Sequence, residues 1–136
     1  MKYRPGELAV VRKAKDLTEY IFLITRTSPK RFRFSLVSRL QNLSLDIVAE
    51  LQDANTVYIR DMDPAAVRER LDHQKRALSL AGRLEYVAEL SAREGAISMK
   101  QYGNISVLTK DIRNMTGAWI NSDSNRIRKS DNRNKR

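Results

Sequence analysis

The chain has 136 residues, a length that fits one domain with a hydrophobic core of its own. It contains no cysteine and one histidine, which excludes disulfides and thiol catalysis and argues against a zinc site. We therefore expect no metal, no cofactor and no enzymatic activity. A net charge of +10 favours negatively charged partners such as nucleic acid. No pattern of a signal peptide or a membrane span is present, so we expect a cytoplasmic protein with no membrane partner.

The first predicted helix covers residues 7–27. Apolar residues recur along it every three or four positions, at Val10, Ala14, Leu17, Ile21 and Ile24. A continuous apolar run over residues 20–24 covers more of the helix circumference than one packing partner needs. Two interpretations stay open: burial on several sides within the monomer, or a second face buried in an oligomer, to which Phe22 would contribute.

The turn after this helix is strongly basic. Pro29 disfavours helical backbone at Ser28, so the helix should end there. No acidic residue occurs between Glu19 and Asp46. The cations of this segment are predicted to bind nucleic acid: Arg26, Lys30, Arg31, Arg33 and Arg39. The alternative is a turn whose charges only face solvent.

Two long helices are predicted next, over residues 31–60 and 64–94. Asp63 can cap the free amides of the second of these helices, Pro64 suits its first position, and Gly95 should end it. Its apolar residues form two stripes, and the second stripe implies either another core neighbour or a subunit contact. We predict an oligomer interface from members of this second stripe, namely Leu80, Leu84 and Val87. His73 is expected to be a surface residue without a partner.

The fourth predicted helix covers residues 99–120. Ser98 and Gln101 form a capping box at its start, and Trp119 near its end is expected to fill part of the core. Short connections at Pro29, Pro64 and Gly95 would fold the four helices back on one another. The predicted fold class is therefore all-α, an up-down-up-down four-helix bundle over residues 1–121.

Residues 122–136 differ from the rest of the chain in composition. They contain six lysines or arginines, two aspartates and one aliphatic residue, too little apolar surface to form a core. A disordered basic C-terminal tail is therefore predicted for this segment. Three of its cations are predicted to contact nucleic acid: Arg126, Arg128 and Lys129. The alternative is a tail that only increases solubility.

The entry to the second helix resembles a motif of a bacterial protein family. The residues that carry the resemblance are Pro29-Lys30, Arg33-Phe34, Leu36, Arg39-Leu40, Ile47 and Ala54-Asn55. The family comprises four-helix-bundle proteins related to the ribosomal (23S rRNA) intervening-sequence protein. Within it, the chain is most similar to the accessory variability determinants of diversity-generating retroelements, over about residues 7–120. The intervening-sequence branch usually carries a Glu-Gly pair where this chain has Glu50 followed by Leu51, which favours the retroelement branch.

The resemblance implies a homopentameric barrel that binds the reverse transcriptase of the same retroelement and its template RNA or cDNA. Such a protein supports error-prone cDNA synthesis and has no catalytic activity of its own. A function of another class stays open, a self-associating scaffold of the intervening-sequence type without a reverse-transcriptase partner. Peripheral membrane binding is disfavoured, because the charged and apolar residues are placed as in a bundle and not as in an interfacial helix. Enzymatic activity is disfavoured because the sequence has no glycine-rich phosphate loop and no Ser/His/Asp arrangement.

Overall fold

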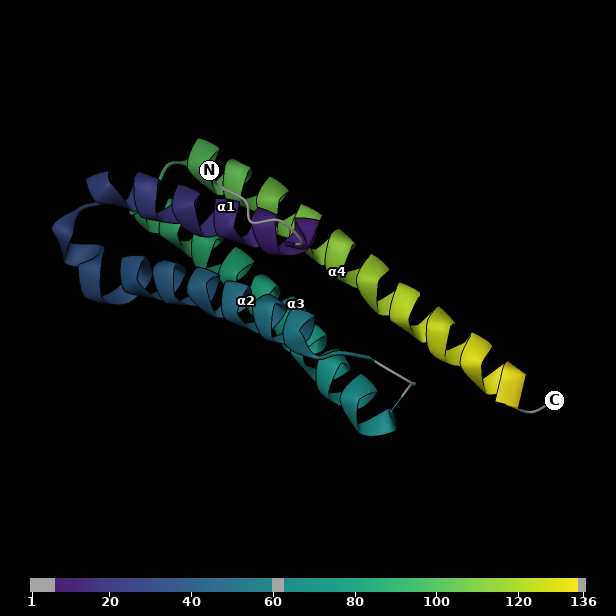
Figure 1. Cartoon of the computed structure of the whole chain (residues 1–136). Helices are drawn as coiled ribbons and strands as arrows, with labels where there is room; N and C mark the ends of the chain where they lie inside the picture. The colour runs from purple at the N-terminus through teal and green to yellow at the C-terminus, as the bar shows by residue number, and fades with distance from the viewer. Residues whose placement is uncertain (1–6, 60–62, 135–136) are drawn as a thin grey trace.

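Four α-helices form the described part of the chain, and consecutive helices run in opposite directions (Figure 1). The computed structural model describes residues 7–59 and 63–134; the parts of the predicted segments at 1–6, 60–62 and 135–136 lie outside them. The helices are α1 (Ala9–Ile24), α2 (Ser38–Thr56), α3 (Pro64–Glu94) and α4 (Met99–Asn134). No strand occurs among the described residues. The predicted all-α four-helix bundle is confirmed.

The core lies between the four helices, because α1 and α3 each pack against both α2 and α4. The apolar positions predicted for the first helix are all buried there. Larger side chains from the other three helices complete the core and are shielded from solvent. They are Leu40, Ile47, Leu51, Leu84, Ile105 and Ile112. Burying a side chain of this size contributes about 1.5–3 kcal/mol, so this interior supplies most of the stability of the fold.

Local signals at the helix ends act as predicted. The Asp63 carboxylate accepts a hydrogen bond from the amide of Ala65 at 3.2 Å, and α3 begins at Pro64. Gly95 ends α3 with φ of 86°, a left-handed conformation that favours glycine. Ser98 and Gln101 exchange hydrogen bonds of 2.8 and 3.0 Å as a capping box before α4.

The predicted limits of the first two helices are wrong. The α-helical part of α1 ends at Ile24, and α2 begins only at Ser38. Between them lie two 3₁₀ turns (Thr25–Thr27 and Lys30–Phe32) and a π-helical turn (Arg33–Val37). The chain reverses direction here within a few residues, and tighter or wider turns accommodate that reversal. α2 ends at Thr56, before the predicted end at Arg60, which lies outside the described residues.

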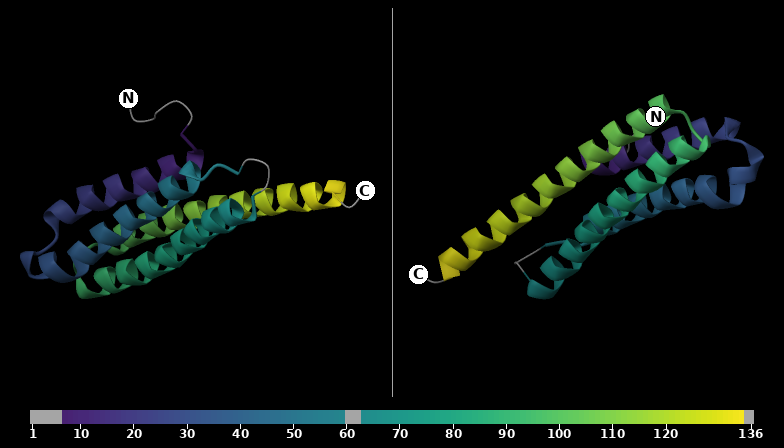
Figure 2. Two further views of the ribbon diagram at one scale, coloured as in Figure 1. Left: turned by 60° about the horizontal axis from the view of Figure 1, so that its bottom comes forward. Right: turned by 180° about the vertical axis from the view of Figure 1, so that it is seen from behind.

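The C-terminal segment differs from the prediction of a disordered tail. α4 does not end near Ile120 but continues as helix to Asn134, and its last turns extend past the neighbouring helices (Figure 2). The physical reason that the helix passes Ile120 is a buried anchor at Asp123, one turn beyond the predicted helix end. Its carboxylate is bound by Arg70 and Gln74 of α3, so this part of α4 belongs to the bundle.

Candidate nucleic-acid interface

The basic turn between α1 and α2 lies at one end of the bundle. Ser28 has extended backbone, with ψ of 142°, because a residue before proline avoids helical backbone. Pro29 is also extended, with ψ of 140°. The Ser28 hydroxyl donates a 2.7 Å hydrogen bond to the carbonyl of Ala96, in the connection between α3 and α4. This contact joins two turns that are far apart in sequence, so the basic segment is held against the folded bundle.

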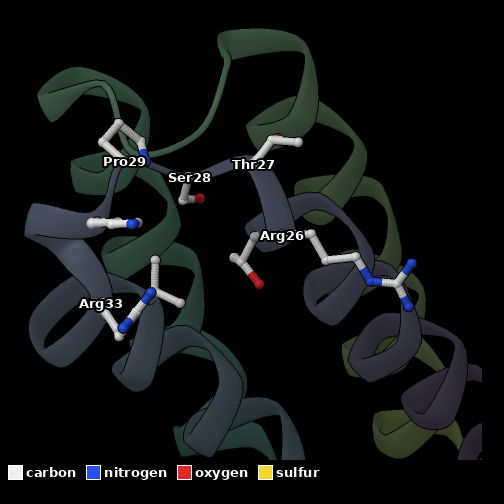
Figure 3. Close-up of a pocket in the computed structure, with 8 residues that line it drawn as sticks. Arg26, Thr27, Ser28, Pro29 and Arg33 are labelled. Atoms are coloured by element: carbon white, nitrogen blue, oxygen red, sulfur yellow. The ribbon is translucent and has the colours of Figure 1, made fainter.

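A hollow of about 200 Å³ lies within this turn (Figure 3). It is lined by Thr25, Arg26, Thr27, Ser28, Pro29, Lys30, Arg33 and Val37. The three hydroxyl groups donate to backbone carbonyls of the protein itself, so they present only lone pairs to a ligand. The groups in the hollow that can attract an anion are therefore the side chains of Arg26, Lys30 and Arg33.

The cations around the hollow do not enclose a single anion. Arg26 and Arg33 come from opposite sides of it, and the Arg26 guanidinium points away over α1 (Figure 3). Separated cations of this kind match an extended chain of phosphates better than one enclosed phosphate. The arrangement is that of a basic surface around a shallow opening, suited to a polyanion.

All five cations predicted for this segment are exposed. No ion pair joins Arg26, Lys30, Arg31, Arg33 or Arg39 to an acid among the residues that the structure describes. The Arg31 guanidinium instead lies 4.5 Å from the centroid of the Phe32 ring, a cation–π contact. Arg39 lies on α2, outside the lining of the hollow. These charges are available to an anionic partner.

The π-helical turn explains why Arg33 is exposed. Arg33 precedes the buried Val37 by four residues and the buried Leu40 by seven, so an uninterrupted α-helix would direct it toward the core. The wider turn over Arg33–Val37 changes this register and brings the guanidinium to the surface. The same turn leaves the ring of Phe34 90% exposed. The sequence pattern did not predict this turn, because it follows no simple period.

The structure does not bring the C-terminal cations to this turn. Arg126, Arg128 and Lys129 lie on the last part of α4, at the opposite end of the molecule (Figure 1). About 27 residues of helix separate Met99 from Arg126, or about 40 Å at 1.5 Å per residue. All three side chains are exposed, although Arg126 lies 3.9 Å from Asp123 and Arg128 donates to Asn125 at 2.8 Å. The predicted nucleic-acid residues therefore form two separate basic regions.

The predicted oligomer residues also fall on different faces. Leu84 is completely buried in the monomer core, so its assignment to a subunit contact is wrong. Leu84 is buried because this part of the second stripe of α3 faces the core. Leu80 and Val87 are half-buried on α3, and Phe22 is 40% exposed on α1.

A polar cluster near the start of α3 was not predicted. Arg70 Nη2 donates to Asp123 Oδ1 at 3.1 Å, and Gln74 donates to Oδ2 at 3.0 Å. The Arg70 guanidinium also lies 4.8 Å from the ring of Trp119, which packs against the core as expected. Burial lowers the pKa of Arg70, and the negative charge of Asp123 acts in the opposite direction. The sequence did not predict this cluster, because Asp123 lies in a segment of tail-like composition and 53 residues from Arg70.

The prediction that His73 is a surface residue without a partner is wrong. Its Nδ1 atom lies 2.7 Å from Glu50 Oε2, and Arg76 Nε lies 3.3 Å from both carboxylate oxygens. Burial favours the neutral form of Glu50, but the hydrogen bonds and charges of His73 and Arg76 outweigh it and lower the pKa of Glu50. A shallow hollow of about 300 Å³ borders this cluster. These contacts join α2 to α3 and give the histidine a structural role.

Fold and surface together define a helical-bundle protein with a basic turn at one end, whose cations form no ion pair within the described residues. Within residues 7–59 and 63–134, no group of three or more acidic, histidine or cysteine side chains is placed to hold a metal ion. None of the described helices combines the length and the apolar character that a membrane span needs. The chain matches no protein-family model, and a search of curated proteins gives no match.

Proposed function

We propose that the protein is a non-catalytic accessory protein of a diversity-generating retroelement. In this role it binds the reverse transcriptase of the retroelement together with template RNA or cDNA, in the cytoplasm, and supports mutagenic reverse transcription. The proposal combines the motif resemblance at the entry to the second helix with the four-helix fold and the basic turn.

The observation that carries the proposal is the set of cations at the turn that have no acidic partner among the described residues. Lys30, Arg31 and Arg33 are exposed within a segment of 26 residues, positions 20–45, that contains no acid. Exposed like charges repel one another and contribute little to stability. A polyanion that neutralises them supplies a physical reason for such a cluster.

A homopentameric barrel is part of this proposal. A cyclic pentamer is built from head-to-tail contacts, so each subunit needs two different contact faces. α1 presents Phe22, and α3 presents Leu80 and Val87. Because both helices pack between α2 and α4, their outer faces point in different directions, which supports a head-to-tail assembly.

The test is the salt dependence of RNA binding. Replacing Lys30, Arg31 and Arg33 together with alanine should weaken binding to unrelated RNA sequences alike. Each neutralised phosphate adds about −0.7 to the slope of log affinity against log salt for single strands, so the slope should flatten by about 2. Fluorescence anisotropy at several salt concentrations measures both quantities.

A matched control removes the same charge elsewhere. Arg68, Lys75 and Lys110 are exposed on α3 and α4, away from the turn. Their triple alanine variant should keep most of the affinity and the salt slope. Equal effects of the two triple variants would show that net charge alone attracts RNA, and an unchanged turn variant would place the RNA site elsewhere.

A self-associating scaffold without a reverse-transcriptase partner is the second candidate. The observation that favours it is the apolar exposure of Phe22 and Leu23 on α1, which suits subunit contacts and needs no RNA. Co-purification with a reverse transcriptase encoded next to this gene separates the two. Capture of that enzyme supports the accessory role, and assembly without capture or RNA binding supports the scaffold.

A further inference from the structure

The ring of Phe34 stands out at the surface of the basic turn. It is 90% exposed, the highest value among the exposed large hydrophobic residues of the described chain. The neighbouring Phe32 is half-buried and lies beneath the Arg31 guanidinium, so the two rings have different surroundings. This phenyl ring contributes nothing to the core of the molecule and is free to contact a partner.

The surroundings of Phe34 identify the chemistry of its partner. Lys30, Arg31 and Arg33 lie within four residues of it, exposed and without an acidic partner in the described chain. A partner for this surface must therefore present flat apolar area and negative charge together. Single-stranded nucleic acid has both, since its bases have exposed π-faces and its phosphates are charged.

We propose that Phe34 stacks on an unpaired base of a single-stranded nucleic acid while the neighbouring cations bind the adjacent phosphates. This inference rests on the proposed function, because it assigns a substrate class to the same basic turn. In a duplex the base faces are already stacked on one another, so a surface ring reaches only the backbone and the groove edges. Phe34 therefore makes the turn selective for single strands, while the cations alone bind either form.

The π-helical turn positions the ring for this contact. Phe34 is the second residue of the wide turn, before the chain enters the regular helix of α2. Because the buried Val37 and Leu40 hold the following residues against the core, the ring is presented from a supported backbone. A rigid aromatic group loses little conformational freedom when a base stacks on it.

The experiment compares Phe34→Ala with the unaltered protein on an unstructured single-stranded RNA and on a blunt duplex of the same sequence. Affinity for the single strand should fall about 5- to 150-fold, the range of one base–aromatic stack, with little change for the duplex. Phe34→Trp should retain single-strand binding, and Phe34→Leu, which keeps apolar area without a π-face, should not. Tyr86→Ala removes another exposed aromatic ring, on α3, and should bind both forms normally.

Other results would overturn the inference. Phe34→Ala could bind the single strand as tightly as the unaltered protein, or could lose both forms equally. Light scattering could show that Phe34→Ala changes the oligomeric state and that Phe34→Leu keeps it. That result would show that a second copy of the chain covers the ring. If the unaltered protein binds no RNA, the proposed function itself fails, whereas RNA binding that ignores Phe34 contradicts only this inference.

Discussion

The Arg70–Asp123 pair offers a direct test of the energetics at the C-terminal end of α4. The two side chains are 14% and 9% exposed, and Arg70 Nε lies 3.0 Å from Asp123 Oδ2. Asp123→Ala leaves the arginine charge in a largely desolvated site. Breaking a buried ion pair by removing one partner costs about 3–5 kcal/mol.

The lower end of this range applies here. Arg70 keeps its 3.4 Å hydrogen bond to the carbonyl of Val57 and its contact with the ring of Trp119. We therefore expect a loss of about 3 kcal/mol. In a chain of this size, that loss lowers the melting temperature by about 10 °C, measured by circular dichroism at fixed protein concentration. Asp131→Ala, an exposed acid on the same helix, is the control and should change the melting temperature little.

Two truncations separate the anchor from the rest of the tail. A chain that ends after Asn125 keeps Asp123, and a chain that ends after Asn121 loses it. The first should melt close to the full-length protein, and the second should lose about as much stability as Asp123→Ala. Equal melting of both truncations, or a loss below about 0.5 kcal/mol for Asp123→Ala, would refute the reasoning, because surface substitutions have effects of that size.

Four further predictions rest on single residues. Glu50→Gln should lower the melting temperature at neutral pH but not in acid. The pKa of Glu50 is lowered in the folded protein, so its carboxylate stabilises the fold above the unfolded pKa of about 4.3, and this stabilisation disappears as the pH falls through the folded pKa. Melting curves measured across this pH range check the sign of the effect. Gly95→Ala should cost about 1 kcal/mol in urea unfolding through its positive φ alone, because no atom lies within 4 Å of the added Cβ, and an unchanged midpoint would contradict it. Leu84→Ala should lower the free energy of unfolding by about 2–5 kcal/mol, because this side chain is completely buried. Leu80 is only half-buried, so Leu80→Glu should dissociate the proposed oligomer while the fold is kept. If light scattering shows that the unaltered protein is a monomer, the prediction for Leu80→Glu is wrong.

Much of the fold was predictable because its signals are local. The caps at Asp63, Gly95 and Ser98 involve atoms within four residues of one another, so residue type and spacing suffice to place them. The apolar stripe of the first helix likewise follows from the helical period. The candidate site was predictable in part, since Lys30 and Arg33 lie in a segment without acids. The exposure of Arg33 was not predictable, because it depends on the π-helical turn.

The sequence by itself determined the helices, their order and the concentration of positive charge at one turn, because periodicity, caps and composition express these properties within short segments. Only the tertiary structure decided which distant residues meet. Asp123 anchors α4 because the packing of α4 against α3 brings its carboxylate to Arg70. Glu50 reaches His73 because α2 packs against α3. The π-helical turn that exposes Phe34 likewise depends on how α2 enters the core. Contacts between helices depend on their relative rotation and offset, which no local pattern encodes.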